Sequence, residues 1–254
     1  MSIRTSSADG VFTIEIARPE KKNALTVAMY QELAAAVAAA HDDASVRCLL
    51  IHGQPDIFTA GNDLEDFLKN PPQDENAPVF QFMAALGNAE KPVVAAVHGA
   101  AVGIGTTMLA HCDLVYAADN AMFSMPFVSL GLCAEFGSSL LIPLAAGYHK
   151  AAEKLLLSEP ISAEEAFEMK LVNRLLPPDE VLAYAQRQAA RFNSLPPASV
   201  RETKRLMKSG WKAVVEKLIV DEVKSFGRML REPEAKEAFT AFFERRKPDF
   251  SKFG

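Results

Sequence analysis

Two glycine turns about forty residues apart decide the fold of this chain: Phe58-Thr-Ala-Gly-Asn-Asp-Leu64 and His98-Gly-Ala-Ala-Val-Gly-Ile-Gly105. Each turn follows a short apolar run that is typical of a strand, and each precedes a segment with the pattern of a helix. The alternation of strand, turn and helix over residues 48–118 predicts right-handed β-α units with parallel strand pairing. In this arrangement, backbone N–H groups at both turns are free to point at a ligand.

Two converging N–H donors of this kind form an oxyanion hole. Such donors stabilise negative charge on a carbonyl oxygen because they are already fixed in place, and removal of one typically costs ~10²–10³ in rate. The two turns therefore predict enolate or oxyanion chemistry.

The segments outside the turns predict a hairpin, several helices and one polar loop. The hairpin covers residues 3–7 and 11–17 around Asp9-Gly10, and an amphipathic helix follows over residues 26–41. Residues 70–78 are polar and rich in proline, which favours a mobile loop near the ligand entrance and makes it a candidate lid.

Beyond Phe136 the pattern is mostly helical and predicts a C-terminal portion that packs on the α/β core. Helices are expected over residues 179–193 and 212–230, and one candidate strand over residues 171–176. The apolar stripes of the two helices fit either the protein's own core or contact with a neighbouring subunit.

Composition excludes several classes of partner. The chain has 254 residues, of which 49% are hydrophobic, enough for one large domain or a domain with an appendage. The net charge of −5 disfavours nucleic acid or an anionic membrane as the main partner. No apolar stretch approaches the ~20 residues that span a bilayer, and the polar N-terminus lacks the features of a signal peptide. We therefore expect cytoplasmic residence.

The cysteines and the basic clusters give weaker indications. Cys48, Cys112 and Cys133 are odd in number and share no close spacing, which favours buried free thiols over a disulfide framework or a zinc site. Basic clusters at residues 18–22 and 245–247 fit an anionic small ligand, and a solvated charged surface explains either cluster equally well.

Other enzyme classes fit the sequence less well. The spaced glycines of residues 99–105 are also found in nucleotide-binding dehydrogenases, but there they follow the first strand of the chain. No tyrosine is followed four places later by lysine, and neither Gly-x-Ser-x-Gly nor His-Glu-x-x-His occurs. His98 and His111 lie in apolar surroundings, which favours structural side chains that are hydrogen-bonded to backbone.

Glu135 is the one acidic residue that stands out. It is the only carboxylate between Asp119 and Glu153, and apolar neighbours would raise its pKa towards that of a useful general base. The alternative is an exposed glutamate at the N-terminus of a helix over residues 136–146, where the helix dipole stabilises the charge. Position alone leaves both interpretations open.

Five segments taken together resemble the enoyl-CoA hydratase/isomerase (crotonase) superfamily almost end to end: residues 18–25, 58–67, 98–113, 121–139 and 239–248. The resemblance implies the α/β crotonase fold, a ClpP-like spiral of ββα turns with a helical C-terminal region. Residues 1–195 would form the spiral core and residues 196–254 a helical trimerisation region. It also implies acyl-CoA thioester substrates, homotrimers or homohexamers, no metal, and no cofactor, because CoA is part of the substrate.

The resemblance assigns roles residue by residue. The N–H groups of Asn62 and Ile104 would form the oxyanion hole. Contacts with acyl-CoA would come from Lys22, Ala24, Ala60, Asp63, Leu64, Gly103, Phe242 and Arg245. Glu65 departs from the pattern, because hydratases commonly carry Lys there.

The glutamates indicate the reaction. Similar hydratases use two glutamates, and their positions are occupied here by Thr107 and Phe127, neither of which can transfer a proton, so ordinary hydration is disfavoured. Glu135 falls where Δ3,Δ2-enoyl-CoA isomerases of the peroxisomal type and their bacterial relatives place a single catalytic glutamate. One carboxylate suffices for a 1,3-shift from C2 to C4.

We therefore expect an isomerase that converts 3-enoyl-CoA into trans-2-enoyl-CoA. Two alternatives remain open. One is another crotonase-fold acyl-CoA reaction, such as a hydratase-like, hydrolytic or ring-opening activity. The other is a non-catalytic acyl-CoA-binding protein.

Overall fold

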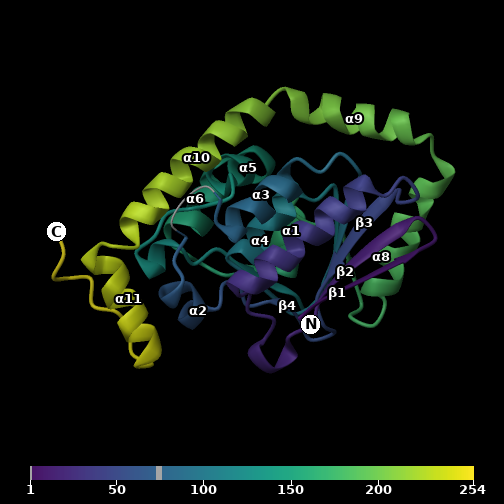
Figure 1. Cartoon of the computed structure of the whole chain (residues 1–254). Helices are drawn as coiled ribbons and strands as arrows, with labels where there is room; N and C mark the ends of the chain where they lie inside the picture. Colours follow the sequence, from purple (N-terminus) through teal and green to yellow (C-terminus); the bar gives the residue numbers. More distant parts are fainter. Residues whose placement is uncertain (1, 73–75) are drawn as a thin grey trace.

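The computed structural model describes residues 2–72 and 76–254 (Figure 1). Its larger sheet has six strands in the order β1-β2-β3-β5-β7-β10. Their bounds are β1 Ile3–Ala8, β2 Val11–Ile16, β3 Cys48–His52, β5 Val93–Val97, β7 Leu114–Ala118 and β10 Arg174–Leu176. β1 and β2 form the predicted antiparallel hairpin, and every other pair in this sheet is parallel, as the β-α alternation predicts.

The smaller sheet has four strands in the order β4-β6-β8-β9: β4 Ile57–Thr59, β6 Ala100–Val102, β8 Met122–Ser124 and β9 Ile161–Ser162. β4, β6 and β8 pair in parallel, and β9 pairs antiparallel with β8. Three strands of the large sheet, β3, β5 and β7, are thus each followed by a short strand of the small sheet. This succession is the spiral of ββα turns that defines the crotonase fold.

The core is centred on β5. All five residues of Val93–Val97 are fully buried, because helices or the second sheet cover both faces of this strand. α8 (Val181–Ala190) packs across β3, β5 and β7, whereas α1 (Val27–Asp42) packs on β1, β2 and α3 (Pro78–Gly87). The Thr26 hydroxyl accepts a hydrogen bond from the Met29 N–H and so begins α1 at the predicted place.

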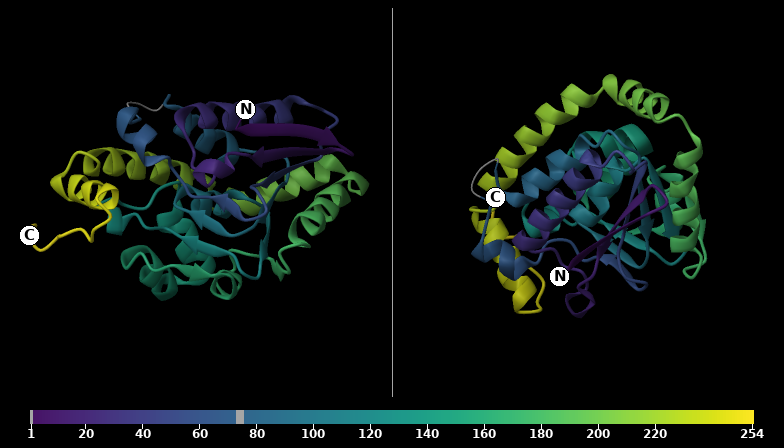
Figure 2. Two further views of the ribbon diagram at one scale, coloured as in Figure 1. Left: turned by 90° about the horizontal axis from the view of Figure 1, so that it is seen from below. Right: turned by 45° about the vertical axis from the view of Figure 1, so that its right-hand side comes forward.

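The other α-helices are α2 Leu64–Lys69, α4 Ile104–Thr107, α5 Ser138–Ala146, α6 Tyr148–Leu156, α7 Ala163–Glu168, α9 Pro197–Ser209, α10 Lys212–Met229 and α11 Pro233–Phe243. Short 3₁₀ turns lie at Pro19–Lys21, Met108–His111, Val128–Leu130 and Arg191–Ser194. Figures 1 and 2 show that α9 and α10 curve around one side of the core and lead to α11. The C-terminal region is therefore helical and packs on the α/β core, as expected. Among the described residues, no helix has both the length and the apolarity needed to cross a bilayer.

Several predicted boundaries require correction. The strand predicted over residues 171–176 begins only at Arg174, and the helix predicted from residue 136 begins at Ser138. The sequence pattern also missed β6, because its three residues are too few to show a period. Of the predicted polar loop, residues 73–75 lie outside the described residues.

Candidate active site

The two glycine turns meet in the structure. β4 and β6, which lead into them, pair in parallel with Ile57 opposite Ala100. Gly61 has a φ of +81°, and a Cβ at this position would lie 2.7 Å from the Val102 carbonyl oxygen. Only glycine allows this approach, since any side chain would push the turns apart.

The two predicted oxyanion donors lie at this junction. The amides beside Asn62 are used within the fold, because Gly61 N–H donates to the Thr59 hydroxyl (3.1 Å) and Asp63 N–H to the Leu25 carbonyl (2.9 Å). Ile104 is the first residue of α4, where helical N–H groups have no intrahelical acceptor. Within residues 2–72 and 76–254, neither the Asn62 nor the Ile104 N–H donates to a protein acceptor. Both groups can therefore bind a ligand oxygen.

Tyr30 holds the side chain of Asn62 at this junction. Its hydroxyl group donates a short hydrogen bond to Oδ1 of Asn62. Burial, and secondly the negative charge of Glu135, raise the pKa of Tyr30 well above its usual value, so the phenol stays neutral. Tyr30 thereby fixes the side chain of the residue whose backbone N–H is the first predicted donor.

Glu135 is buried, with 7% of its surface exposed, which rules out the alternative of an exposed helix-terminal glutamate. The Thr107 hydroxyl donates to Oε1 of Glu135 at 2.5 Å. Burial raises the pKa of Glu135 to about 8; the Thr107 hydrogen bond opposes this rise and the charge of Glu222 adds to it. Such a carboxyl group is a stronger base than an ordinary glutamate.

Thr107 has a role that sequence reasoning missed. The family resemblance identifies Thr107 only as the residue at the position of a hydratase glutamate, where it cannot transfer a proton. It lies at the end of α4, whose first residue is Ile104, so one short helix supplies both a predicted oxyanion donor and the hydroxyl that holds Glu135. The sequence offered one signal for this role, because the hydroxyl group of a threonine can donate a hydrogen bond to a carboxylate.

Glu222 of α10 holds the chain just beyond Glu135. Its carboxylate accepts hydrogen bonds from the Gly137 N–H (2.6 Å), the Ser139 N–H (3.2 Å) and the Ser139 hydroxyl (2.5 Å). Phe136 and Gly137 have φ values of +56° and +73°, an unfavourable turn that these bonds stabilise. No sequence signal marks this contact, because Glu222 is 83 residues from Ser139.

The two histidines have the structural roles that the sequence predicts. His111 Nε2 is bonded to the Phe136 carbonyl at 2.7 Å, and its ring stacks on that of Phe136. Burial lowers the pKa of His111 to about 4, so the ring is neutral. His98 Nε2 is bonded to the Pro178 carbonyl at 2.9 Å.

The structure brings Lys22, Ala24, Ala60, Asp63 and Leu64 into one region. Ala60 N–H donates to the Lys22 carbonyl at 3.0 Å, and Asp63 caps α2, which begins at Leu64. Asp63 also pairs with Arg18 at 2.8 Å, so its carboxylate already stabilises the free protein.

Asn23, which sequence reasoning missed, fastens this region to β4. It is fully buried, and its side-chain amide donates to the carbonyls of Ile57 and Phe58. The other predicted CoA contacts, Phe242 and Arg245, are exposed at the end of α11.

All three cysteines are free thiols. Cys48 is buried as expected, whereas Cys112 and Cys133 are only partly buried.

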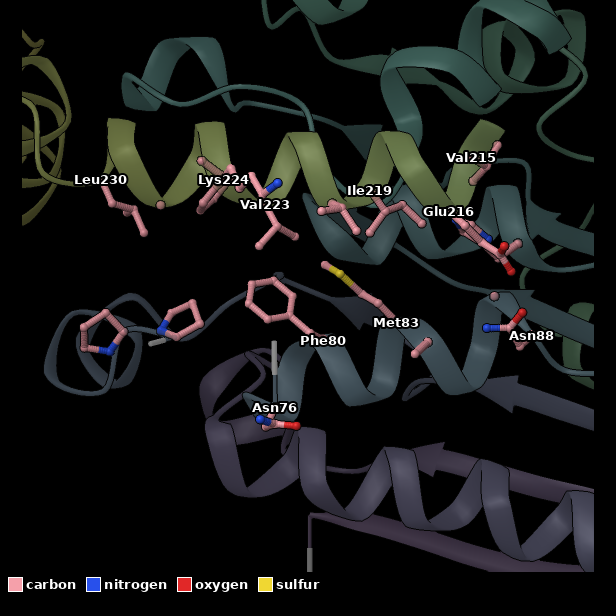
Figure 3. A pocket seen from close by; sticks show the side chains of 18 of the residues that line it. Asn76, Phe80, Met83, Asn88, Val215, Glu216, Ile219, Val223, Lys224 and Leu230 are labelled. Atoms are coloured by element: carbon pink, nitrogen blue, oxygen red, sulfur yellow. The ribbon is translucent and has the colours of Figure 1, made fainter. Parts of the chain in front are cut away.

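A cavity of about 1050 Å³ lies between α3 and α10 (Figure 3). Its lining does not include Glu135, Asn62 or Ile104. A second cavity of about 400 Å³ is lined in part by Leu25 and Tyr30. Pro71 and Pro72 border both cavities, so the described part of the predicted loop lies between them.

Comparisons with known proteins agree with this architecture. Residues 6–252 match the family model described as enoyl-CoA hydratase/isomerase. Crotonyl-CoA hydratase of Syntrophomonas wolfei is 35% identical over 243 residues, covering 92% of each chain. Enoyl-CoA delta isomerase 2 of Rattus norvegicus is 35% identical over 216 residues, covering 83% of this chain and 55% of that protein. The structure of Pseudomonas aeruginosa OdaA has 47% sequence identity and a TM-score of 0.94, covering 96% of this chain and 99% of OdaA.

Proposed function

Because the chain belongs to the enoyl-CoA hydratase/isomerase family and has the crotonase fold, we propose that it is an isomerase that converts 3-enoyl-CoA into trans-2-enoyl-CoA. The relatives include both hydratases and a delta isomerase, so the choice of reaction rests on the carboxylates of this chain. The observation that carries the proposal is the buried carboxyl group of Glu135, held by Thr107 beside the junction of the two turns.

The proposed reaction moves one proton along the acyl chain. The N–H groups of Asn62 and Ile104 donate to the thioester oxygen, and the carboxylate of Glu135 removes the proton from C2. The resulting dienolate carries its negative charge on the oxygen that the two amides hold. Glu135 then returns the proton to C4, the double bond lies between C2 and C3, and the carboxylate is regenerated. No water is consumed, and a second acid or base is unnecessary.

The remaining predicted residues fit the same proposal. Lys22, Ala24, Ala60, Asp63, Leu64 and Gly103 would contact acyl-CoA around the junction, and Phe242 and Arg245 would contact it from α11. We also propose that residues 196–254 form the contacts of a homotrimer, or of a hexamer built from trimers. Exposed apolar side chains on α9 and α10 support this, among them Leu206, Met207 and Val214.

Glu135→Gln tests the proposal, because glutamine keeps the shape of the side chain but cannot transfer a proton. We expect turnover of a 3-enoyl-CoA to fall by at least ~10³, with acyl-CoA affinity nearly unchanged. Glu164→Gln, on the exposed side of α7, is the matched control and should retain full activity. Turnover that survives in Glu135→Gln would remove this residue from the mechanism.

A hydratase-like or hydrolytic reaction is the second candidate, favoured by the full-length match to a crotonyl-CoA hydratase. In that case Glu135 would activate water rather than shuttle a proton. Incubation in ¹⁸O-labelled water separates the two reactions: the isomerase product gains no labelled oxygen, whereas a hydration or hydrolysis product does. Tight acyl-CoA binding without turnover of either 3-enoyl-CoA or 2-enoyl-CoA would instead indicate a binding protein.

A further inference from the structure

The cavity between α3 and α10 is a groove with apolar walls. Figure 3 shows Phe80 and Met83 of α3 facing Ile219 and Val223 of α10 across the open space. Its volume of about 1050 Å³ is at the upper end of the range for small-molecule sites, which is ~300–1,000 Å³.

One part of the groove lies near the second predicted oxyanion donor. Phe226 lines the groove, and its ring centroid lies 6.4 Å from that of Phe127. Phe127 in turn packs against the second glycine turn, since a Cβ at Gly103 would lie 3.9 Å from its ring. Gly103 directly precedes Ile104, the second predicted donor, so Phe226 and Phe127 connect the groove with the place where a thioester oxygen would bind.

A second contact connects the groove with residues 135–139, which form the catalytic loop of the proposed function. A Cβ at Gly137 would lie 3.0 Å from Cγ1 of Val215 and 3.6 Å from Cγ1 of Ile219, both of which line the groove. Gly137 is two residues beyond Glu135. The groove therefore runs past both parts of the proposed site.

The groove continues from this point along α10 to its N-terminal end. Phe226 and Trp211 both line it and are 15 residues apart, which corresponds to ~22 Å along a helix. An extended chain advances about 1.2 Å per bond, as in a polypeptide, so sixteen carbons need roughly 18 Å. Asn88, Lys212 and Glu216 line the far end of the groove and are exposed, so the groove opens to solvent there. Figure 3 shows Asn88 and Glu216 at this same end.

We infer that this groove binds a long aliphatic acyl chain, with the thioester at the Phe226 end and the terminal carbons directed towards Trp211. The inference rests on the proposed function, because it takes an acyl-CoA thioester as the ligand of the site beside the groove. Because the far end is open, chains longer than the groove project into solvent and are accepted. A four-carbon acyl group fills only a small part of the apolar wall.

Binding of saturated acyl-CoAs with 4, 8, 12 and 16 carbons tests this inference by titration calorimetry. These ligands have no double bond, so their affinity does not depend on isomerisation. Each buried methylene can raise affinity by up to about fourfold. We expect the sixteen-carbon ligand to bind at least ~100-fold more tightly than the four-carbon ligand. Equal affinity across the series would overturn the inference.

Val223→Trp and Lys217→Trp form a matched pair on α10. Val223 lines the groove, whereas Lys217 is exposed and does not. We expect Val223→Trp to weaken binding of the sixteen-carbon ligand at least ~30-fold and of the four-carbon ligand less than ~2-fold, because the indole blocks the groove beyond the thioester. Lys217→Trp should match the wild type. Identical behaviour of the two variants would contradict the inference.

Two controls keep this test independent of protein folding and of the proposed reaction. If Val223→Trp does not fold, Ile219→Phe fills the same groove with a smaller added volume. The series of four acyl-CoA lengths on the wild-type protein also tests the inference without any variant. Length-graded binding in a protein that does not isomerise 3-enoyl-CoA would overturn the proposed function and leave the groove assignment standing. Isomerisation with a flat binding series would overturn the groove assignment alone.

Discussion

At the scale of single residues, the site depends on a carboxyl group placed where its charge is unfavourable. Glu135 is almost entirely removed from water and lies near a second buried carboxyl group, Glu222, which adds to its elevated pKa. Perturbed acids of this kind are concentrated at functional sites. The sequence indicated Glu135 from its isolation among apolar residues, but Thr107 and Glu222 could not be recognised as its partners, because both act through contacts formed only on folding.

The pH dependence of activity follows from this elevated pKa. Glu135 must be ionised to remove the C2 proton, and its pKa is about 8. We expect kcat/KM for a 3-enoyl-CoA to rise about tenfold per pH unit below that value and to level off above it. Initial rates between pH 5.5 and 9.5 measure the profile. A rising limb centred near pH 4.5, the ordinary range of glutamate, would contradict the assignment.

Glu222 should shift that profile, since its charge raises the pKa of Glu135. Ionisable groups near the pair include Tyr30, which stays neutral, Cys133, whose thiol pKa burial raises, and Arg228, whose charge acts on Cys133. In Glu222→Gln, we expect the rising limb of kcat/KM to move to lower pH. Asp221→Asn, an exposed neighbour on α10, is the matched control and should leave the limb in place. A purely structural role of Glu222 would lower kcat/KM without moving the limb.

At the scale of secondary-structure elements, the decisive feature is the parallel pairing of β4 with β6, which brings two distant turns together. The sequence predicted both turns and the helices after them, because glycine clusters and helix periodicity are local signals. The sequence did not predict β6 or the small sheet, because a strand of three residues is too short to show a periodic pattern and is defined by its pairing with neighbouring strands. The anchoring of this region by Asn23 escaped prediction for the same reason.

Gly61→Ala tests this close approach. An added Cβ would lie 2.7 Å from the Val102 carbonyl in a backbone with a φ of +81°. We expect a loss of ~1–3 kcal/mol in the free energy of unfolding, together with a ~10²-fold loss in kcat as the Asn62 N–H moves away from the Ile104 N–H. Gly210→Ala is the control, because no atom lies within 4 Å of its added Cβ. Urea unfolding and steady-state rates measure both effects; a fully active Gly61→Ala would contradict the role of the junction.

At the scale of the whole molecule, the C-terminal helices are fastened to the core by buried charged groups. Lys204 of α9 donates to the Lys91 carbonyl at 2.8 Å and pairs with Asp113 at 2.6 Å, and Glu222 makes the corresponding attachment from α10. The α/β core and the helical C-terminal portion were predictable from periodicity. The path of α9 and α10 around the core was not, because it is fixed by single long-range contacts.

Ionisation of the buried Glu135 should lower the free energy of unfolding of the whole chain. Between pH 4.5 and about 8 the folded protein retains a proton that the unfolded chain has released, so the free energy of unfolding falls as pH rises through this window. Glu135→Gln lacks this proton. We expect the variant to be as stable as the wild type at pH 4.5 and ~4 kcal/mol more stable at pH 9. Urea unfolding at both pH values measures the difference; equal stability at pH 9 would show that Glu135 is not desolvated.

One stripe of α10 carries both kinds of contact described above. Ile219, Val223 and Phe226 line the groove, and Glu222 lies among them at helical spacing, with its carboxylate bonded to the catalytic loop. The α10 side chains that would contact the acyl chain and the carboxylate that raises the pKa of Glu135 thus belong to one helix. A substitution that moves α10 to fit another acyl chain length would also move Glu222. We therefore expect substrate range and pH optimum to change together among descendants of this protein.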